Sequence, residues 1–370
     1  MSKFIPVSVY CLLFSLVINA QQLKFPPDEK HRKIEVSDLA KPGYLKPVKD
    51  PDFGTTIVRI TDSTVFGKKG VRHHYSKDQP WNCDQSLILM EKWILDGNTY
   101  KILRKMEIPE EPRWSFKDPE KLFGVKENSF VSFNVKSGKL NILYTFAGFD
   151  KILIGPWEGN VSADDRYVAL QGSVSGEWHV IVFDIQAKKI LASEKAIDLG
   201  PYKTFDWVTI SPSGKYVVIN FRQSRSSNGG IISYDRKLNK IADIFATGEH
   251  GDLGYDAEGN EVFVQVCPFQ YGRLDNGAVK SFHTKSCGHM SLRNYKRPGW
   301  CYTSVNESYI MAIKLDDSGL VERFTNHRSS GSPYNAEPHA VPSPDGKRIM
   351  FASDWKKSGE NNSYVVYLEE

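Results

Sequence analysis

Four potential metal ligands lie within one stretch of the chain, between His250 and Tyr302. Cys267 and Cys287 stand 20 positions apart, and His289 follows the second cysteine by two positions. Thiolate and imidazole are the donors that zinc prefers, and four of them complete a closed tetrahedral site. Their spacing is not that of a zinc finger, so neighbouring strands of a repeat fold must bring them together. The sequence therefore predicts that His250, Cys267, Cys287 and His289 bind one structural zinc ion.

A second interpretation of the same stretch stays open. Cys267 and Cys287 would then be buried apolar residues or a disulfide, and the two histidines would be ordinary surface residues. Metal analysis of protein purified without chelator distinguishes the two interpretations, because only the first requires bound zinc.

The first 20 residues have the pattern of a secretory signal peptide. Lys3 precedes an apolar run from Ile5 to Ile18, and the small residue Ala20 ends the segment. The run is too short for a comfortable membrane span, and no stop-transfer segment follows it. We therefore expect a secreted or periplasmic protein with a signal peptide over residues 1–20, an N-terminal extension over 21–54, and no membrane span.

Composition limits the classes of partner. The 370 residues include 48 basic and 44 acidic side chains, for a net charge of +4. So small an excess argues against nucleic acid as a partner and permits an acidic substrate. A chain of this length buries a large core and does not depend on disulfides for stability, and we expect it to act as a monomer.

Short repeated phrases predict the fold. The chain has 12% aromatic residues, 28 glycines and 19 prolines, and no long segment shows helical periodicity, which predicts an almost all-β protein. A turn followed by an apolar strand recurs at markers Asp84, Asp165, Ser213, Glu258 and Asp345, which are 81, 48, 45 and 87 residues apart. Degenerate copies at 117–125 and 297–305 fill the two long intervals. Seven units of about 43 residues are typical of a seven-bladed β-propeller.

A second repeat predicts how the ring closes. An outer hairpin follows six of the seven turns, but the last unit ends near residues 364–370, where its outer strand is due. The apolar segment Thr55–Thr61 has no blade of its own. We therefore expect this segment to pair with Tyr364–Leu368, so that a single propeller domain spans residues 55–370 and has no free sheet edge.

The residues ahead of each turn should face the ligand-binding end of the propeller. They include histidines, arginines, carboxylates and tryptophans, where ordinary inner strands would have Val, Ala, Ser and Gly. Some tryptophans, such as Trp114 and Trp300, would instead pack between blades. Aromatic faces and charged donors arranged in a ring suit a carbohydrate ligand. In blade order the candidates are Arg72, His73, His74, Tyr75 and Trp81; Arg113 and Trp114; Trp157, Glu158 and Asn160; Asp206 and Trp207; His250 and Asp252; His289, Ser291 and Arg293; Glu337 and His339.

Several phrases resemble those of secreted seven-bladed polysaccharide lyases. They are RHHYSKDQPWNCD, EPRWSFKDPEKLF, FDWVTISPSGKYVVINF, CGHMSLRNYKRPGWCYTS and EPHAVPSPDGKRIMFASDW, and the resemblance extends over nearly the whole mature chain. The similarity is strongest to propeller-type ulvan lyases and weaker to oligogalacturonate lyases. It implies β-elimination of a uronic-acid-containing polysaccharide by histidine and tyrosine, an arginine facing the uronate, and a structural zinc ion. The expected partner is therefore an acidic polysaccharide.

The reaction itself sets three requirements. A base removes the proton at C5, an acid protonates the leaving O4, and a cation offsets the carboxylate charge. His73 or His74 can serve as the base, and only one of them can line the channel, because adjacent strand residues face opposite sides. His74 is preferred because it precedes Tyr75 and can share a hydrogen-bonded cluster with it. Arg222 and Arg72 are candidates for the carboxylate. Arg72, Tyr75, Arg113, Trp207 and His339 are expected to bind the substrate.

The acid is where the chain departs from the family pattern. A tyrosine is expected near the phrase FDWVT, but Trp207 stands there, and Tyr202 and Tyr75 are the nearest substitutes. Two alternatives to a lyase therefore remain. A carbohydrate-binding propeller needs no proton-transfer pair. A glycoside hydrolase needs two facing carboxylates, and the available groups are Glu158, Asp206, Asp252 and Glu337.

Overall fold

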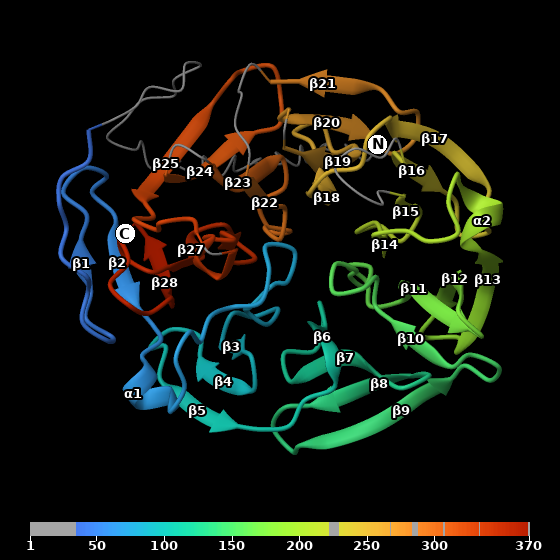
Figure 1. Ribbon diagram of the computed structural model, residues 1–370, viewed down its shortest axis with the longest axis horizontal. Coiled ribbons are helices and arrows are strands. Elements are labelled where there is room, and N and C mark those ends of the chain that lie inside the picture. Colours follow the sequence, from blue (N-terminus) through green and yellow to red (C-terminus); the bar gives the residue numbers. More distant parts are fainter. Residues whose placement is uncertain are drawn as a thin grey trace, which may run out of the picture.

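Seven antiparallel sheets arranged around one axis make up the computed structural model (Figure 1). The structure describes residues 35–221, 229–266, 268–282, 288–305, 308–332 and 334–368. In these residues the helices are short: α1 (Ser63–Phe66), α2 (Ala196–Leu199) and the 3-10 turn η1 (Tyr334–Ala336). None of these helices is long and apolar enough to cross a membrane. The predicted signal peptide over 1–20 lies outside the described residues.

Blades two to six each have four strands, numbered from the axis outward. The first blade has three, β3 (Leu87–Met90), β4 (Trp93–Asp96) and β5 (Ile102–Lys105), with a bridge from Trp81 to Ile88 in place of an inner strand. The others are β6 (Glu110–Trp114), β7 (Lys121–Lys126), β8 (Ser129–Asn134) and β9 (Lys139–Thr145); β10 (Lys151–Leu153), β11 (Tyr167–Val174), β12 (Glu177–Asp184) and β13 (Lys189–Lys195); β14 (Trp207–Ile210), β15 (Val217–Asn220), β16 (Ile231–Tyr234) and β17 (Lys240–Phe245); β18 (Gly251–Tyr255), β19 (Glu261–Gln265), β20 (Gln270–Arg273) and β21 (Val279–Ser281); β22 (Gly288–Ser291), β23 (Trp300–Val305), β24 (Tyr309–Lys314) and β25 (Val321–Asn326).

The repeated turn phrase connects the first two strands of a blade. In the fourth blade the backbone N–H of Ser211 donates to the carbonyl of Tyr216 at 2.8 Å and closes the turn. Gly214 in this turn and Gly346 in the seventh blade both have φ 72, a left-handed conformation that glycine adopts without steric cost. A Cβ on Gly214 would also lie 2.6 Å from the ring of Tyr167 in the preceding blade. The turn therefore needs glycine both for its backbone and for blade packing.

The core lies between the blades. Seven hydrophobic clusters occur among the described residues, one at each contact between neighbouring sheets. Strands such as β15 and β16 are buried along their whole length because both faces of each sheet are covered. Their continuous Val and Ile runs are the pattern expected of such strands. Each blade is thus stabilised by two neighbours, and this holds for all seven only in a closed ring.

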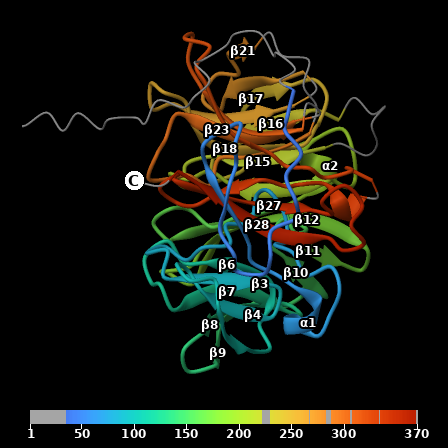
Figure 2. The ribbon, with the colours of Figure 1, turned by 90° about the vertical axis from the view of Figure 1, so that its left-hand side faces the viewer.

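The N-terminal strand closes the ring, as predicted. The seventh sheet has the order β1 (Val48–Lys49), β2 (Thr56–Arg59), β28 (Asn362–Tyr367), β27 (Arg348–Ser353) and β26 (Val341–Pro342). Thr56 lies opposite Tyr367, and Arg59 lies opposite Tyr364, in antiparallel register. Figure 2 shows the blue N-terminal segment along the outside of this blade. The sequence did not predict β1, a two-residue strand that covers the edge of β2.

Buried polar contacts fix the same segment to the sixth blade. The hydroxyl of Thr55 donates to the carbonyl of Phe324 at 2.6 Å, and Asp50 accepts from Thr325 at 2.7 Å. Arg328 lies 3.3 Å from the fully buried Asp50 carboxylate. Loss of one partner from such a buried pair leaves an uncompensated charge. The closure is therefore specified by polar contacts as well as by strand pairing.

Replacement of Ile57 by Ala tests the closure. Ile57 lies in β2, is fully buried, and packs in the cluster between the sixth and seventh blades. Its truncation should lower the free energy of unfolding by about 2–5 kcal/mol, as for a core residue. Ile142→Ala, at a position 60% exposed on β9, should change it by less than about 0.5 kcal/mol. Urea denaturation measures both, and equal stability of the two variants would contradict a structural role for β2.

Candidate metal and substrate site

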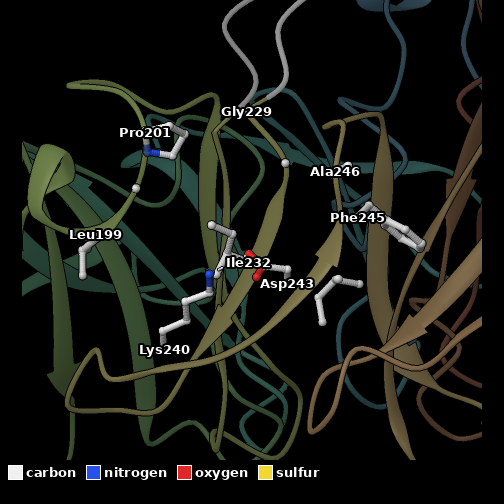
Figure 3. A pocket seen from close by; sticks show the side chains of 11 residues that line it. Leu199, Pro201, Gly229, Ile232, Lys240, Asp243, Phe245 and Ala246 are labelled. Carbon is white, nitrogen blue, oxygen red and sulfur yellow. Dashed lines mark ion pairs between the residues drawn. The ribbon is translucent and has the colours of Figure 1, made fainter.

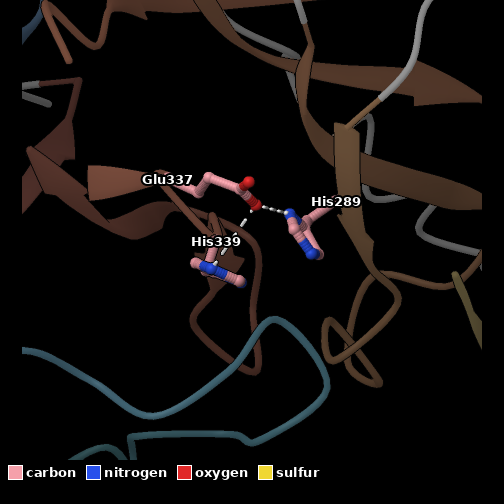
Figure 4. Close-up of side chains that lie close together, drawn as sticks. All are labelled: His289, Glu337 and His339. Atoms are coloured by element: carbon pink, nitrogen blue, oxygen red, sulfur yellow. Dashed lines mark ion pairs between the residues drawn. The ribbon is translucent and has the colours of Figure 1, made fainter. Parts of the chain in front are cut away.

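Two imidazoles and a carboxylate converge at one end of the propeller axis. His289 lies on β22, whereas Glu337 and His339 lie between η1 and β26 (Figure 4). Glu337 Oε2 is 3.2 Å from His289 Nδ1 and 3.9 Å from His339 Nε2, and the two imidazole centroids are 4.0 Å apart. One ligand atom from each of the three residues lies within 4.8 Å of the others. The sixth and seventh blades thus place three donors around one point.

The nitrogen atoms of this cluster are suited to a metal ion. His289 Nε2 and both ring nitrogens of His339 are buried and have no hydrogen-bond partner among the described residues. Burial, followed by the charge of His250, lowers the pKa of His289 to about 3. Burial also lowers the pKa of His339 well below its usual value, and His289 adds to this effect. Both imidazoles are therefore neutral at ordinary pH, the state that ligates metals.

Tyr75 occupies the centre of the surrounding aromatic contacts. Its ring centroid lies 5.3 Å from that of His289 and 5.1 Å from that of His339. Its hydroxyl is 3.0 Å from His250 Nδ1, and the His250 ring is 5.0 Å from that of His289. Burial, with a smaller effect of Glu158, raises the pKa of Tyr75 well above its usual value, so the phenol keeps its proton. Tyr75 and His250 thus form a hydrogen-bonded pair beside the cluster.

Arg72 and Tyr334 complete this side of the site. Arg72 Nη1 donates to the carbonyl of His74 at 3.2 Å, and burial lowers the pKa of Arg72, which Tyr334 and Glu337 partly offset. Tyr334 is 53% exposed and lies 5.2 Å, between ring centroids, from His339. A cation and an exposed phenol therefore border the candidate metal position. No sequence pattern pointed to Tyr334, because it lies in the short η1 turn and outside the turn repeat.

His73 and His74 face different environments, as expected of adjacent residues. His73 is buried, its Nε2 lies 2.6 Å from the carbonyl of His339, and burial lowers its pKa to about 3. His74 is half exposed and contacts the Asp78 carboxylate through Nδ1. His73 therefore supports the backbone at His339. His74 is the one of the two that a ligand can reach.

The other predicted contacts are engaged within the protein. Arg113 is buried, pairs with Asp78 at 3.1 Å, and donates to two backbone carbonyls of the neighbouring blade. Trp207 is 1% exposed and packs between the fourth and fifth blades, with Lys77 Nζ 3.8 Å from its ring centroid. Its indole is not exposed for stacking on a sugar. Lys77, which the sequence did not single out, is itself buried and pairs with Glu158.

Four predicted residues lie elsewhere or are not described. Tyr202 packs against the hydrophobic cluster between the third and fourth blades. Arg222, Cys267 and Cys287 lie outside the described residues, so the zinc set of His250, Cys267, Cys287 and His289 stays a prediction. What the structure does place beside His289 is Glu337 and His339, residues that the sequence suggested for other roles.

Two of the four carboxylates considered for a hydrolase are engaged in ion pairs. Arg293 donates to both oxygens of Asp252, at 2.8 and 3.0 Å, and both side chains are buried. Glu158 accepts from Lys77. A hydrolase needs one carboxyl group to act as an acid and another as a base or nucleophile. Paired carboxylates of this kind favour a structural role.

A large cavity lies away from the cluster, at the outer part of the fourth blade (Figure 3). Leu199, Ile232 and Phe245 contribute apolar walls, and the Lys240–Asp243 ion pair lies at its edge. Gly229, next to the undescribed residues 222–228, also lines it. The described residues that line the cavity include no histidine or cysteine, so they offer none of the chemistry of the His289 cluster.

Solved structures of other proteins share this fold. An oligogalacturonate lyase in complex with manganese has a TM-score of 0.64 and 15% identity, over 88% of this chain and 96% of its own. An oligogalacturonate lyase from Vibrio parahaemolyticus has a TM-score of 0.62 and 11% identity, over 88% and 97%. A chain of the mitotic checkpoint complex has a TM-score of 0.51 and 12% identity, over 91% and 98%. No family model and no curated protein match the sequence.

These similarities establish the architecture. Identities of 11–15% show a shared fold, and proteins with unrelated roles have the same propeller. The function must therefore be argued from the residues at the end of the axis.

Removal of a cluster imidazole tests the metal site. His289→Ala or His339→Ala should weaken Mn²⁺ binding at least about 100-fold, since loss of a ligand exceeds the effect of an outer-shell change. His179→Ala is a matched control, because His179 lies on β12 against Phe149, in the third blade. Isothermal titration of the metal-depleted proteins measures the affinities. Equal Mn²⁺ affinity of all three variants would show that the cluster is not the site.

Proposed function

We propose that this protein is a secreted lyase that cleaves a uronic-acid-containing polysaccharide, of ulvan or pectic type, by β-elimination with a bound divalent cation. The observation that carries the proposal is the cluster of His289, Glu337 and His339, with buried unpaired imidazole nitrogens, next to the hydrogen-bonded pair Tyr75–His250. The propeller similarity to an oligogalacturonate lyase in complex with manganese supports both the reaction and the use of a divalent metal.

The cluster supplies a position for the cation. His289 and His339 would provide neutral nitrogen ligands and Glu337 an oxygen ligand, a set that suits zinc or manganese. A cation bound there supplies positive charge that stabilises the uronate carboxylate as negative charge develops on it. Zinc remains the prediction from the cysteine-containing set, whereas the His–Glu set also accommodates manganese.

Arg72 is assigned to the uronate carboxylate. Its guanidinium lies beside Glu337 and Tyr334, at the exposed side of the cluster. A planar guanidinium can engage both carboxylate oxygens and lowers the barrier to removal of the C5 proton. Arg222 keeps the same predicted role.

His250 and Tyr75 are assigned to proton transfer. The C5 proton is next to the carboxylate, and His250 is the imidazole whose ring adjoins the cluster without belonging to it. Tyr75 fixes the orientation of His250 through Nδ1 and, because its raised pKa keeps it protonated, has a proton for the leaving O4. His74 is the second candidate for the base. It contacts the carboxylate of Asp78, and a general base is often oriented by a third group in this way.

Substitutions of the two candidate bases separate these assignments. His250→Ala should lower the elimination rate at least about 100-fold, the factor typical of a positioned base. His74→Ala should lower it less if His250 is the base. Ultraviolet absorbance of the unsaturated product measures the rate on ulvan and on polygalacturonate. Full activity of both variants would contradict proton transfer by either histidine.

The two tyrosines offer a matched pair for the acid. Tyr75→Phe removes the hydroxyl that contacts His250 and should lower turnover at least about 100-fold. Tyr202→Phe keeps the aromatic ring in the packing between the third and fourth blades and should retain activity within a factor of about three, since a change away from the site costs about 0.5 kcal/mol or less. The reverse result would transfer the acid role to Tyr202. Product without ultraviolet absorbance would instead indicate hydrolysis, and binding without product would indicate a carbohydrate-binding propeller.

A further inference from the structure

Trp157 presents an indole to solvent at the same end of the axis. It follows β10 in the third blade and is 47% exposed. Among the described Trp, Tyr and Phe residues the exposed side chains are Trp157 and Tyr334, and Tyr334 adjoins the His289–Glu337–His339 cluster. Both exposed rings therefore belong to the face that carries the proposed reaction. The proton-transfer and metal roles assigned above do not use Trp157.

The backbone at Trp157 adopts a conformation that a tryptophan rarely takes. Its φ is 68, in the left-handed region, where a side chain crowds the backbone. A strained residue of this kind persists only when its surroundings impose the conformation. The contacts around Trp157 show what imposes it.

Two buried side chains of the second blade hold the Trp157 peptide from both ends. The Glu111 carboxylate accepts from the backbone N–H of Trp157 and from that of Ile154. Arg113 Nη2 donates to the carbonyl of Trp157 at 2.7 Å, and its Nε donates to the carbonyl of Gly159 at 2.6 Å. Glu111 is fully buried, and Arg113 is 4% exposed. The loop is therefore fixed by two buried charged groups, of which Arg113 also pairs with Asp78.

The indole lies against groups that bind hydroxyls. Its ring is 4.9 Å from that of His74 at an angle of 41°, and His74 pairs with Asp78. The next residue, Glu158, pairs with Lys77. One residue beyond His74 is Tyr75, which contacts His289 and His339. An apolar ring and several polar groups thus lie next to the proposed reaction site.

We propose that Trp157 and His74 form a subsite that stacks on a pyranose ring of the chain next to the reacting uronate. Sugar rings place their C–H faces on aromatic rings and direct their hydroxyls outward, here toward Asp78 and Glu158. A ring held rigidly before binding loses little conformational freedom on binding, which accounts for the two anchors. The inference rests on the proposed function, because it names where the substrate extends beyond the cleaved bond.

Oligosaccharides of increasing length test this subsite. The probes are oligogalacturonates and ulvan oligosaccharides of two to six units, titrated calorimetrically into the intact protein with Mn²⁺. Trp157→Ala should weaken binding of the longest probe at least tenfold and that of the shortest by less than twofold. Trp157→Phe, which keeps a ring, should restore at least a third of the affinity. The matched control is Ile142→Ala, which removes another exposed apolar side chain, on β9.

The possible outcomes are distinct. A loss of affinity that grows with probe length in Trp157→Ala, and is absent from Ile142→Ala, supports the subsite. If the wild type binds the probes in this way but no elimination is detected, the lyase proposal fails and the binding subsite is still supported. A loss equal for all lengths places Trp157 in the reaction site and overturns the subsite. Unchanged affinity in Trp157→Ala, or no binding of either probe series to the wild type, also overturns it. Glu111→Gln should weaken binding of the longest probe as Trp157→Ala does. Unchanged affinity of the Glu111→Gln variant for this probe would contradict a positioning role of Glu111.

Discussion

Closure of the ring is the constraint on which the rest of the structure depends. The pairing of β2 with β28 joins residues about 300 positions apart and gives the seventh blade its outer strands. Tyr75 comes from the segment ahead of the first blade, His250 and His289 from the fifth and sixth, and His339 from the seventh. These side chains meet only because the last blade packs against both the sixth and the first. The relative positions of the side chains in such a site are therefore set by the packing between blades.

The chemistry of the site follows from burial. Removal of His289 and His339 from water disfavours their charged forms. A neighbouring imidazole adds to the effect in each case, His250 for His289 and His289 for His339. His289 Nε2 and both ring nitrogens of His339 have no hydrogen-bond partner among the described residues, an arrangement that is costly unless a ligand satisfies them. The same low-dielectric surroundings raise the pKa of Tyr75, so that it remains a proton donor. Burial thus accounts both for the neutral imidazoles that can bind a cation and for the phenol that keeps its proton.

The fold could be predicted from the sequence because each blade has its own local pattern, a turn phrase followed by an apolar strand. The closure could be predicted because six outer hairpins for seven turns leave the last blade without an outer strand of its own. The sequence also identified His289, His339 and Glu337 as residues facing the axis. The sequence pattern did not predict that these three residues contact one another, because their contact depends on how the sixth and seventh blades pack. The prediction of a zinc site instead relied on proximity along the chain. The burial of Trp207 beneath Lys77 and the fixed loop at Trp157 depend on contacts between blades, which no local pattern records.

X-ray absorption fine structure of the metal-depleted protein, loaded with one equivalent of Zn²⁺, tests the central claim most directly. The account predicts a first shell of nitrogen and oxygen atoms at about 2.0–2.2 Å, the range of imidazole and carboxylate ligands of zinc, with the multiple scattering of imidazole. This imidazole signal should weaken in His339→Ala. A shell with sulfur at about 2.3 Å, or a spectrum of fully hydrated Zn²⁺ with no imidazole signal, would contradict a metal site at His289, Glu337 and His339.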